Sequence, residues 1–81
     1  MATKTAYAKA WGAEIRARRE LLDLSRRDLA SDVKVTPTMV GYWEQGRHAP
    51  SPRMQALLIQ RLGIDPVTVA KLVLKGGEDA A

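Results

Sequence analysis

The feature that most constrains the fold of this 81-residue chain is a helix-capping residue followed directly by proline. A Ser, Thr or Asp side chain can accept hydrogen bonds from the free amides at a helix start, and proline has the backbone angle of the first helical turn. Glycine, which often ends helices, follows after each pair. The pairs are Thr36-Pro37, Ser51-Pro52 and Asp65-Pro66, and the glycines are Gly46, Gly63 and Gly76-Gly77. The pattern predicts a chain of short helices.

Hydrophobic spacing adds two helices to these three, so we expect an all-α domain of five helices. The expected ranges are 5–22, 26–33, 37–45, 52–62 and 66–75. No stretch alternates as a strand would, and no Asn-Gly or Asp-Gly turn occurs in the sequence. The length allows one domain, expected at 1–76, followed by a short disordered tail at 77–81.

The composition excludes several classes of function. The chain has no cysteine and one histidine, His48, so disulfides, thiolate metal sites and multi-histidine metal sites are excluded. We find no carboxylate pair, phosphate-binding glycine loop or histidine-centred cluster, so neither an enzyme nor a cofactor is expected. The N-terminus does not resemble a signal peptide, and the most apolar stretch, 67–74, is too short to span a membrane. We therefore expect a cytoplasmic protein with no membrane contact.

The charge and the shortest connection both indicate a nucleic-acid partner. The formal net charge is +4 and the sequence pI is about 9.9, with the basic residues concentrated in the first third of the chain. Only three residues separate the expected helices 26–33 and 37–45. Two helices joined so closely must cross steeply, which predicts a helix-turn-helix unit at about 25–46.

Several motifs between residues 15 and 64 make a family resemblance specific. They are Ile15-Arg-Ala-Arg-Arg19, Leu24-Ser-Arg-Arg-Asp-Leu-Ala30, Val35-Thr-Pro-Thr-Met-Val-Gly-Tyr-Trp-Glu-Gln-Gly46, Pro50 and Leu62-Gly-Ile64. In these motifs the chain resembles the phage-repressor and Cro class of helix-turn-helix regulators, the xenobiotic-response-element family. The resemblance implies a compact five-helix domain of the phage-repressor type that binds double-stranded DNA.

The resemblance places the base-contacting residues on the helix expected at 37–45. Val40 lies on its inner face, and the opposite face is expected to enter the major groove. Four residues are candidate base contacts: Pro37, Thr38, Gly41 and Tyr42. Gly41 would allow a close approach to DNA or would simply loosen the helix. For Tyr42 the alternative is a packing role.

Four arginines are candidate phosphate contacts: Arg26, Arg27, Arg47 and Arg53. Arg26 and Arg27 stand in the first turn of their helix, where cations oppose the helix dipole, and DNA phosphates would reverse that effect. The alternative for this pair is that both arginines are simply solvated. His48 is interpreted as an exposed loop residue. Lys9, Arg16 and Arg18 are interpreted as a solvated helix face.

The resemblance also implies a buried ion pair between Arg19 and Glu44 that sets the angle of the helix at 37–45. Arg18, where the family usually has an apolar residue, is a competitor for Glu44. Lys34 stands where the family usually has glycine in the turn. If the backbone is left-handed there, lysine costs roughly 1–2 kcal/mol.

The last helix predicts a homodimer. Apolar residues surround it almost completely, and a domain of this size cannot bury such a helix on all sides. The expected dimer residues are Val69, Leu72 and Val73. The alternative is an amphipathic helix on which Val69 or Val73 is merely exposed.

The predicted function is a small repressor or Cro-like regulator that recognises a DNA operator as a homodimer. No second domain for a small-molecule effector is expected. The alternative is an antitoxin or protein-bridging module of the same fold, which would act mainly through a protein partner.

Overall fold

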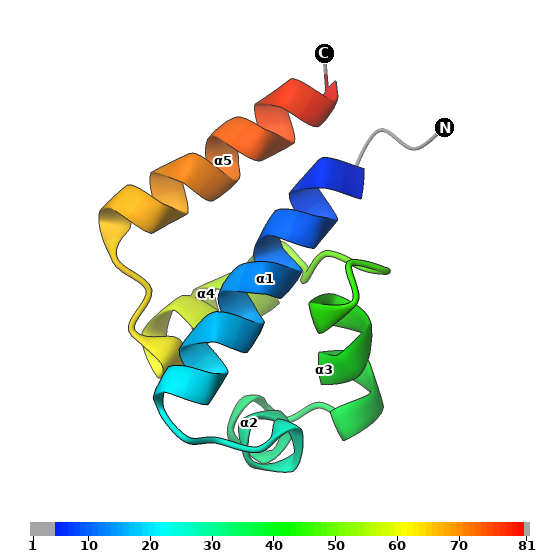
Figure 1. Ribbon diagram of the computed structural model, residues 1–81, viewed down its shortest axis with the longest axis vertical. Helices are drawn as coiled ribbons and strands as arrows, with labels where there is room; N and C mark the ends of the chain where they lie inside the picture. The colour runs from blue at the N-terminus through cyan, green and yellow to red at the C-terminus, as the bar shows by residue number, and fades with distance from the viewer. Residues whose placement is uncertain (1–4, 81) are drawn as a thin grey trace.

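The computed structural model describes residues 5–80, with side chains from residue 6 to residue 75. The described residues form α1 (Thr5–Leu21), α2 (Arg26–Val33), α3 (Pro37–Glu44), α4 (Pro52–Leu62) and α5 (Pro66–Ala80). Figure 1 shows them packed into one body, which measures 35 × 26 × 20 Å. The predicted all-α class and the number of helices are confirmed. None of these helices is both long and apolar enough to cross a bilayer.

The helix starts follow the capping pattern. Ser25 accepts a hydrogen bond from the amide of Asp28 (3.0 Å), and the Asp28 carboxylate accepts one from the amide of Ser25 (3.1 Å), which completes a capping box. Thr36, Ser51 and Asp65 each accept one from the backbone three residues further on, at 3.2, 3.3 and 3.1 Å. The predicted starts of α2, α3, α4 and α5 are therefore confirmed.

The end of the last helix differs from the prediction. We expected a stop at Gly76-Gly77 and a disordered tail, but α5 continues through both glycines to Ala80. A glycine within a helix costs roughly 1 kcal/mol relative to alanine and does not forbid the helix. Residues 77–80 are therefore helical, and Ala81 lies outside the described residues.

The core lies around α1, which packs between α3 and α5 (Figure 1). Leu72 of α5 is 5% exposed and belongs to this core. The prediction that placed Leu72 at a dimer surface is therefore wrong, because an all-apolar stretch does not reveal which of its faces turns inward. The core consists of Trp11, Ile15, Leu29, Ala30, Val33, Val40, Trp43, Leu58, Leu62, Ile64 and Leu72.

Candidate nucleic-acid interface

The turn between α2 and α3 is built on a left-handed residue. Lys34 ends α2 with φ 63°, so the left-handed conformation that the sequence left conditional is present, with its cost for a lysine. The next amide, of Val35, donates to the carbonyl of Ala30 (2.9 Å) and closes the end of the helix. Thr36 then caps α3. Helices α2 and α3 thus pack against each other across a three-residue connection, as the helix-turn-helix prediction required.

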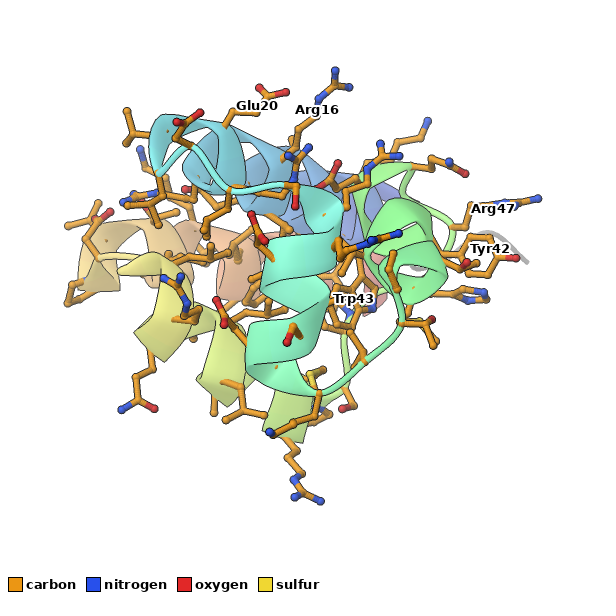
Figure 2. The ribbon with its side chains drawn as sticks, turned by 90° about the horizontal axis from the view of Figure 1, so that it is seen from below. Arg16, Glu20, Tyr42, Trp43 and Arg47 are labelled. Carbon is orange, nitrogen blue, oxygen red and sulfur yellow. The ribbon has the colours of Figure 1, made fainter. Side chains whose placement is uncertain are left out.

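Helix α3 has a buried face and an exposed face. Val40 is fully buried and Trp43 is 3% exposed, and Figure 2 shows Trp43 pointing into the molecule. Pro37 and Thr38 are exposed, and Tyr42 is half-buried. The exposed face therefore presents a hydroxyl and a phenol, as expected of a face available to DNA.

Gly41 lies in α3 beside this exposed face, but it is buried. A Cβ atom placed on it would lie 3.8 Å from Nη1 of Arg26, the nearest neighbouring atom. The sequence left two alternatives for Gly41, a close approach by DNA and a loosened helix. A guanidinium from the start of α2 lies over the glycine, so its backbone is not bare on this side.

Near the end of α3, half-buried Tyr42 forms a surface cluster with Arg47 and His48, which follow the helix and are exposed. We call it the Tyr42 cluster. The Arg47 guanidinium lies 5.0 Å from the centre of the Tyr42 ring, and the His48 ring meets it edge-on at 5.5 Å. Gly46, with φ 75°, turns the chain back so that the Arg47 amide donates to the Tyr42 carbonyl (3.0 Å). Figure 2 shows Tyr42 and Arg47 projecting together away from the molecule.

From the sequence alone, Tyr42 and Arg47 are separate candidates for DNA contact and His48 is a loop residue. The sequence does not predict that the three lie together. The available signal was the glycine four residues after Tyr42, because a left-handed residue after a helix reverses the chain over its last turn.

The Glu44 carboxylate receives two arginines at the end of α3. Arg19 donates to it through Nε (2.6 Å) and Nη2 (3.1 Å), which confirms the geometry of the expected ion pair. Arg26 donates to it through Nε at 3.0 Å. The carboxylate side chain is 1% exposed and that of Arg19 is 12% exposed. Burial raises the pKa of Glu44, but the hydrogen bonds from Arg19 and Arg26 outweigh it and hold this pKa below its ordinary value.

This arrangement changes the interpretation of Arg26. From the sequence alone, Arg26 and Arg27 are cations without local compensation at the start of a helix. Glu44 supplies that compensation for Arg26, whose side chain remains 44% exposed. Arg27 and Arg53 are both exposed, in the first turns of α2 and α4.

Arg18 does not compete for Glu44. It donates to Glu14 (2.6 Å) on its own helix and to Asp65 (2.6 Å) at the start of α5. Its Nη1 also donates to the carbonyl of Gly63 (3.2 Å). The interpretation of Arg18 as solvated is therefore wrong, because it links α1 to the beginning of α5.

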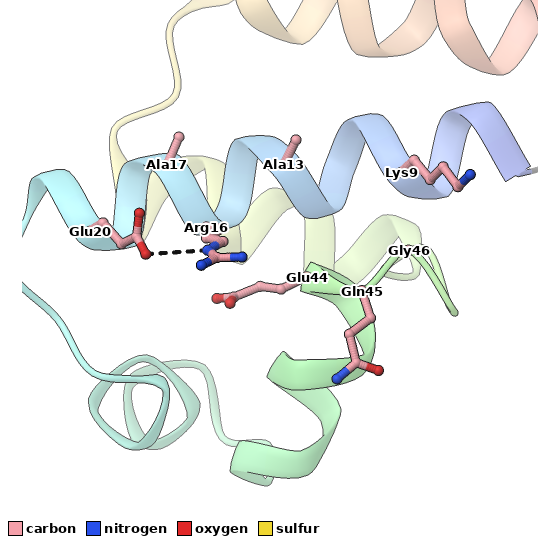
Figure 3. Close-up of a pocket in the computed structure, with 8 residues that line it drawn as sticks. All are labelled: Lys9, Ala13, Arg16, Ala17, Glu20, Glu44, Gln45 and Gly46. Carbon is pink, nitrogen blue, oxygen red and sulfur yellow. Dashed lines mark hydrogen bonds and ion pairs between the residues drawn. The ribbon is translucent and has the colours of Figure 1, made fainter.

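An open groove of about 440 Å³ lies between α1 and the end of α3. Figure 3 shows Glu44 reaching from α3 toward α1, with the exposed pair of Arg16 and Glu20 (3.2 Å) beside it. This pair is solvated, as predicted for Arg16. The groove is lined by Lys9, Ala13, Arg16, Ala17, Glu20, Glu44, Gln45 and Gly46.

Comparisons with known proteins agree with this geometry. Residues 10–72 match the model of a family described as a helix-turn-helix domain. Two solved structures of the clp gene regulator ClgR from Corynebacterium glutamicum have similar folds. One has a TM-score of 0.71 and 28% identity, covering 91% of this chain and 77% of that chain. The other has a TM-score of 0.69 and 27% identity, covering 93% of this chain and 94% of that chain. No curated protein matches the sequence.

Proposed function

The chain belongs to the helix-turn-helix domain family, and from this premise we propose that it is a sequence-specific DNA-binding transcriptional regulator, of the small repressor or Cro-like kind. One observation carries the proposal. The exposed face of α3 holds polar side chains next to exposed cations, while its buried face is fixed to the rest of the domain. The likeness to ClgR, a clp gene regulator, supports the same function.

In this proposal α3 enters the major groove of double-stranded DNA. The Thr38 hydroxyl can donate to or accept from a base edge, and its methyl group can contact a thymine methyl. Pro37 lies beside it at the helix start, where it approaches the same bases. Tyr42 presents its phenol one turn further on, with its ring supported by Arg47.

The exposed arginines around α3 are proposed to contact phosphates. Arg27 lies in the first turn of α2, Arg47 follows α3 and Arg53 lies in the first turn of α4, so the three come from three different segments. Phosphate contacts supply affinity and register without sequence information. Arg26 has a different geometry, because Glu44 holds it over α3.

We further propose that two copies pair through the outward face of α5. Val67, Val73 and Leu74 are 65%, 66% and 66% exposed, a large apolar surface for so small a domain. Val69 is half-buried beside them. Because α1 lies between α5 and α3, a partner on α5 leaves α3 free for DNA. A twofold pair with recognition helices about 34 Å apart would bind a near-palindromic operator.

The deciding experiment is the selection of bound sites from random duplex DNA. We expect one recurrent motif, with an affinity that falls steeply as salt rises, because bound phosphates release counterions. Thr38→Ala should relax the preference at one base position by about 1–3 kcal/mol. Arg27→Gln should weaken binding to all sequences alike, whereas Arg61→Gln at the end of α4, which removes the same charge elsewhere, should change the affinity little. Selection of no motif would overturn the proposal and favour the alternative of a protein partner.

A further inference from the structure

We propose that Arg26 recognises a guanine base in the operator, with its guanidinium held over Gly41 by the carboxylate of Glu44. The inference rests on the proposed function and assigns one of its specificity contacts. It replaces the simpler expectation that Arg26 is a phosphate contact.

The first step concerns which edge of the guanidinium is free. Arg26 uses Nε to donate to Glu44, and no hydrogen bond or ion pair recorded among the described residues involves its two terminal nitrogens. Arg19 differs, because it uses Nε, Nη1 and Nη2 to bind Glu44 and the carbonyl of Leu24. Arg26 therefore keeps its terminal edge, with two parallel N–H donors, available to a ligand.

The second step concerns where that edge lies. Nη1 of Arg26 is 3.8 Å from the position that a Cβ of residue 41 would take. Residue 41 is three positions after Thr38 in α3, so the two share one side of the helix. The guanidinium thus lies next to the place where a side chain of residue 41 would begin, although it comes from α2.

The third step separates a base from a phosphate. A phosphate contact depends mainly on net charge, and the charge of Arg26 is partly balanced by Glu44 at 3.0 Å. Recognition of guanine depends on the direction of a planar pair of donors, which match its O6 and N7 acceptors. The Glu44 side chain is 1% exposed, so it holds that direction firmly. The pairing with Glu44 lowers the net positive charge around Arg26, and it fixes the direction in which the terminal N–H groups of Arg26 donate.

The test compares the motif selected by the wild type with the motif selected by Arg26→Gln. We expect the wild-type motif to contain a guanine whose preference falls by about 5- to 150-fold in the variant. Other positions should keep their preference. Arg27→Gln is the matched control. It should weaken binding to all DNA sequences uniformly and reduce the dependence of the affinity on salt concentration.

A second pair of variants keeps the arginine and changes what lies beneath it. Gly41→Leu should displace the guanidinium and lose the preference at the same base position. Gly41→Ala adds a methyl group at an ordinary contact distance of 3.8 Å and should keep that preference.

Two outcomes are distinct. If the wild type selects no motif, the proposed function fails and this inference fails with it. The wild type selects a motif in the other case. If Arg26→Gln then selects the same motif with the same preferences, or loses affinity for every sequence alike, only the guanine contact is overturned.

Discussion

Arg18 and Arg19 are neighbours on α1, yet they connect α1 to opposite sides of the domain. Arg19 binds Glu44 at the end of α3, and Arg18 binds Asp65 at the start of α5. The Glu44 side chain is 1% exposed and that of Asp65 is 47% exposed. An exposed ion pair contributes little to the stability of the fold, whereas a buried one is costly to break. We call the Arg19–Glu44 contact the α3 junction and the Arg18–Asp65 contact the α5 junction. Mutation of the α3 junction should therefore lower stability far more than mutation of the α5 junction.

The largest expected effect is that of Glu44→Ala. This change leaves the largely buried Arg19 without its carboxylate partner, with only the Leu24 carbonyl still bound. Breaking such a pair costs about 3–5 kcal/mol of the free energy of unfolding. Chemical denaturation measures it. The matched control is Glu14→Ala, which removes one carboxylate partner of Arg18 and should cost much less. Equal losses in the two variants would contradict the contrast between the junctions.

Acid should weaken both junctions. Hydrogen bonds from Thr68, and then from Arg18, hold the pKa of Asp65 well below its ordinary value of 3.8, and the pKa of Glu44 lies below its ordinary value of 4.5. A depressed pKa gives stability that is present above the ordinary value and is lost as the pH falls through the folded value. The melting temperature should therefore decline below about pH 4.5.

Replacing each carboxylate with an amide, which does not titrate, separates the contributions of Glu44 and Asp65 to the loss of stability in acid. Glu44→Gln and Asp65→Asn should each lower stability at neutral pH and flatten the decline in acid. If the melting temperature of both variants declined with falling pH as steeply as that of the wild type, other groups would control the acid sensitivity.

A smaller effect is expected at Asp65 itself. Asp65→Ala removes both the cap of α5 and one of the two carboxylate partners of Arg18, so amide hydrogen exchange should accelerate at the start of α5 while α3 stays protected. Asp65→Asn keeps a capping oxygen and removes the ion pair, and should fall between the wild type and Asp65→Ala. Faster exchange in α3 would mean that the two junctions are coupled.

The smallest effect on the stability of one chain is expected from Val73→Glu, on the outward face of α5. Its side chain is 66% exposed, so the folded chain should persist while the proposed dimer dissociates. Sedimentation at micromolar concentration measures this, with Gln60→Glu on the exposed side of α4 as the control that adds the same charge elsewhere. A wild type that stays monomeric, both free and on DNA, would rule out the dimer.

The sequence predicts the helix starts and the partner of Arg19 because these depend on local capping and on a recurrent family motif. It does not predict the partners of Arg26 and Arg18. Asp65 is 47 positions from Arg18, and Glu44 is 18 positions from Arg26, so these contacts appear only once the helices are packed. Leu72 shows the same limit, because the inward face of α5 is set by α1.

The attachment of α3 at its end has a consequence for the entropy of DNA binding. A helix of eight residues is unstable by itself in water, since the few hydrogen bonds it makes cannot offset the ordering of its backbone. Buried Val40 and Trp43, and the carboxylate gripped by two arginines, order this segment when the domain folds. The entropy of ordering α3 is therefore lost when the domain folds and not when DNA binds. More of the free energy of the DNA contacts then remains to distinguish one sequence from another.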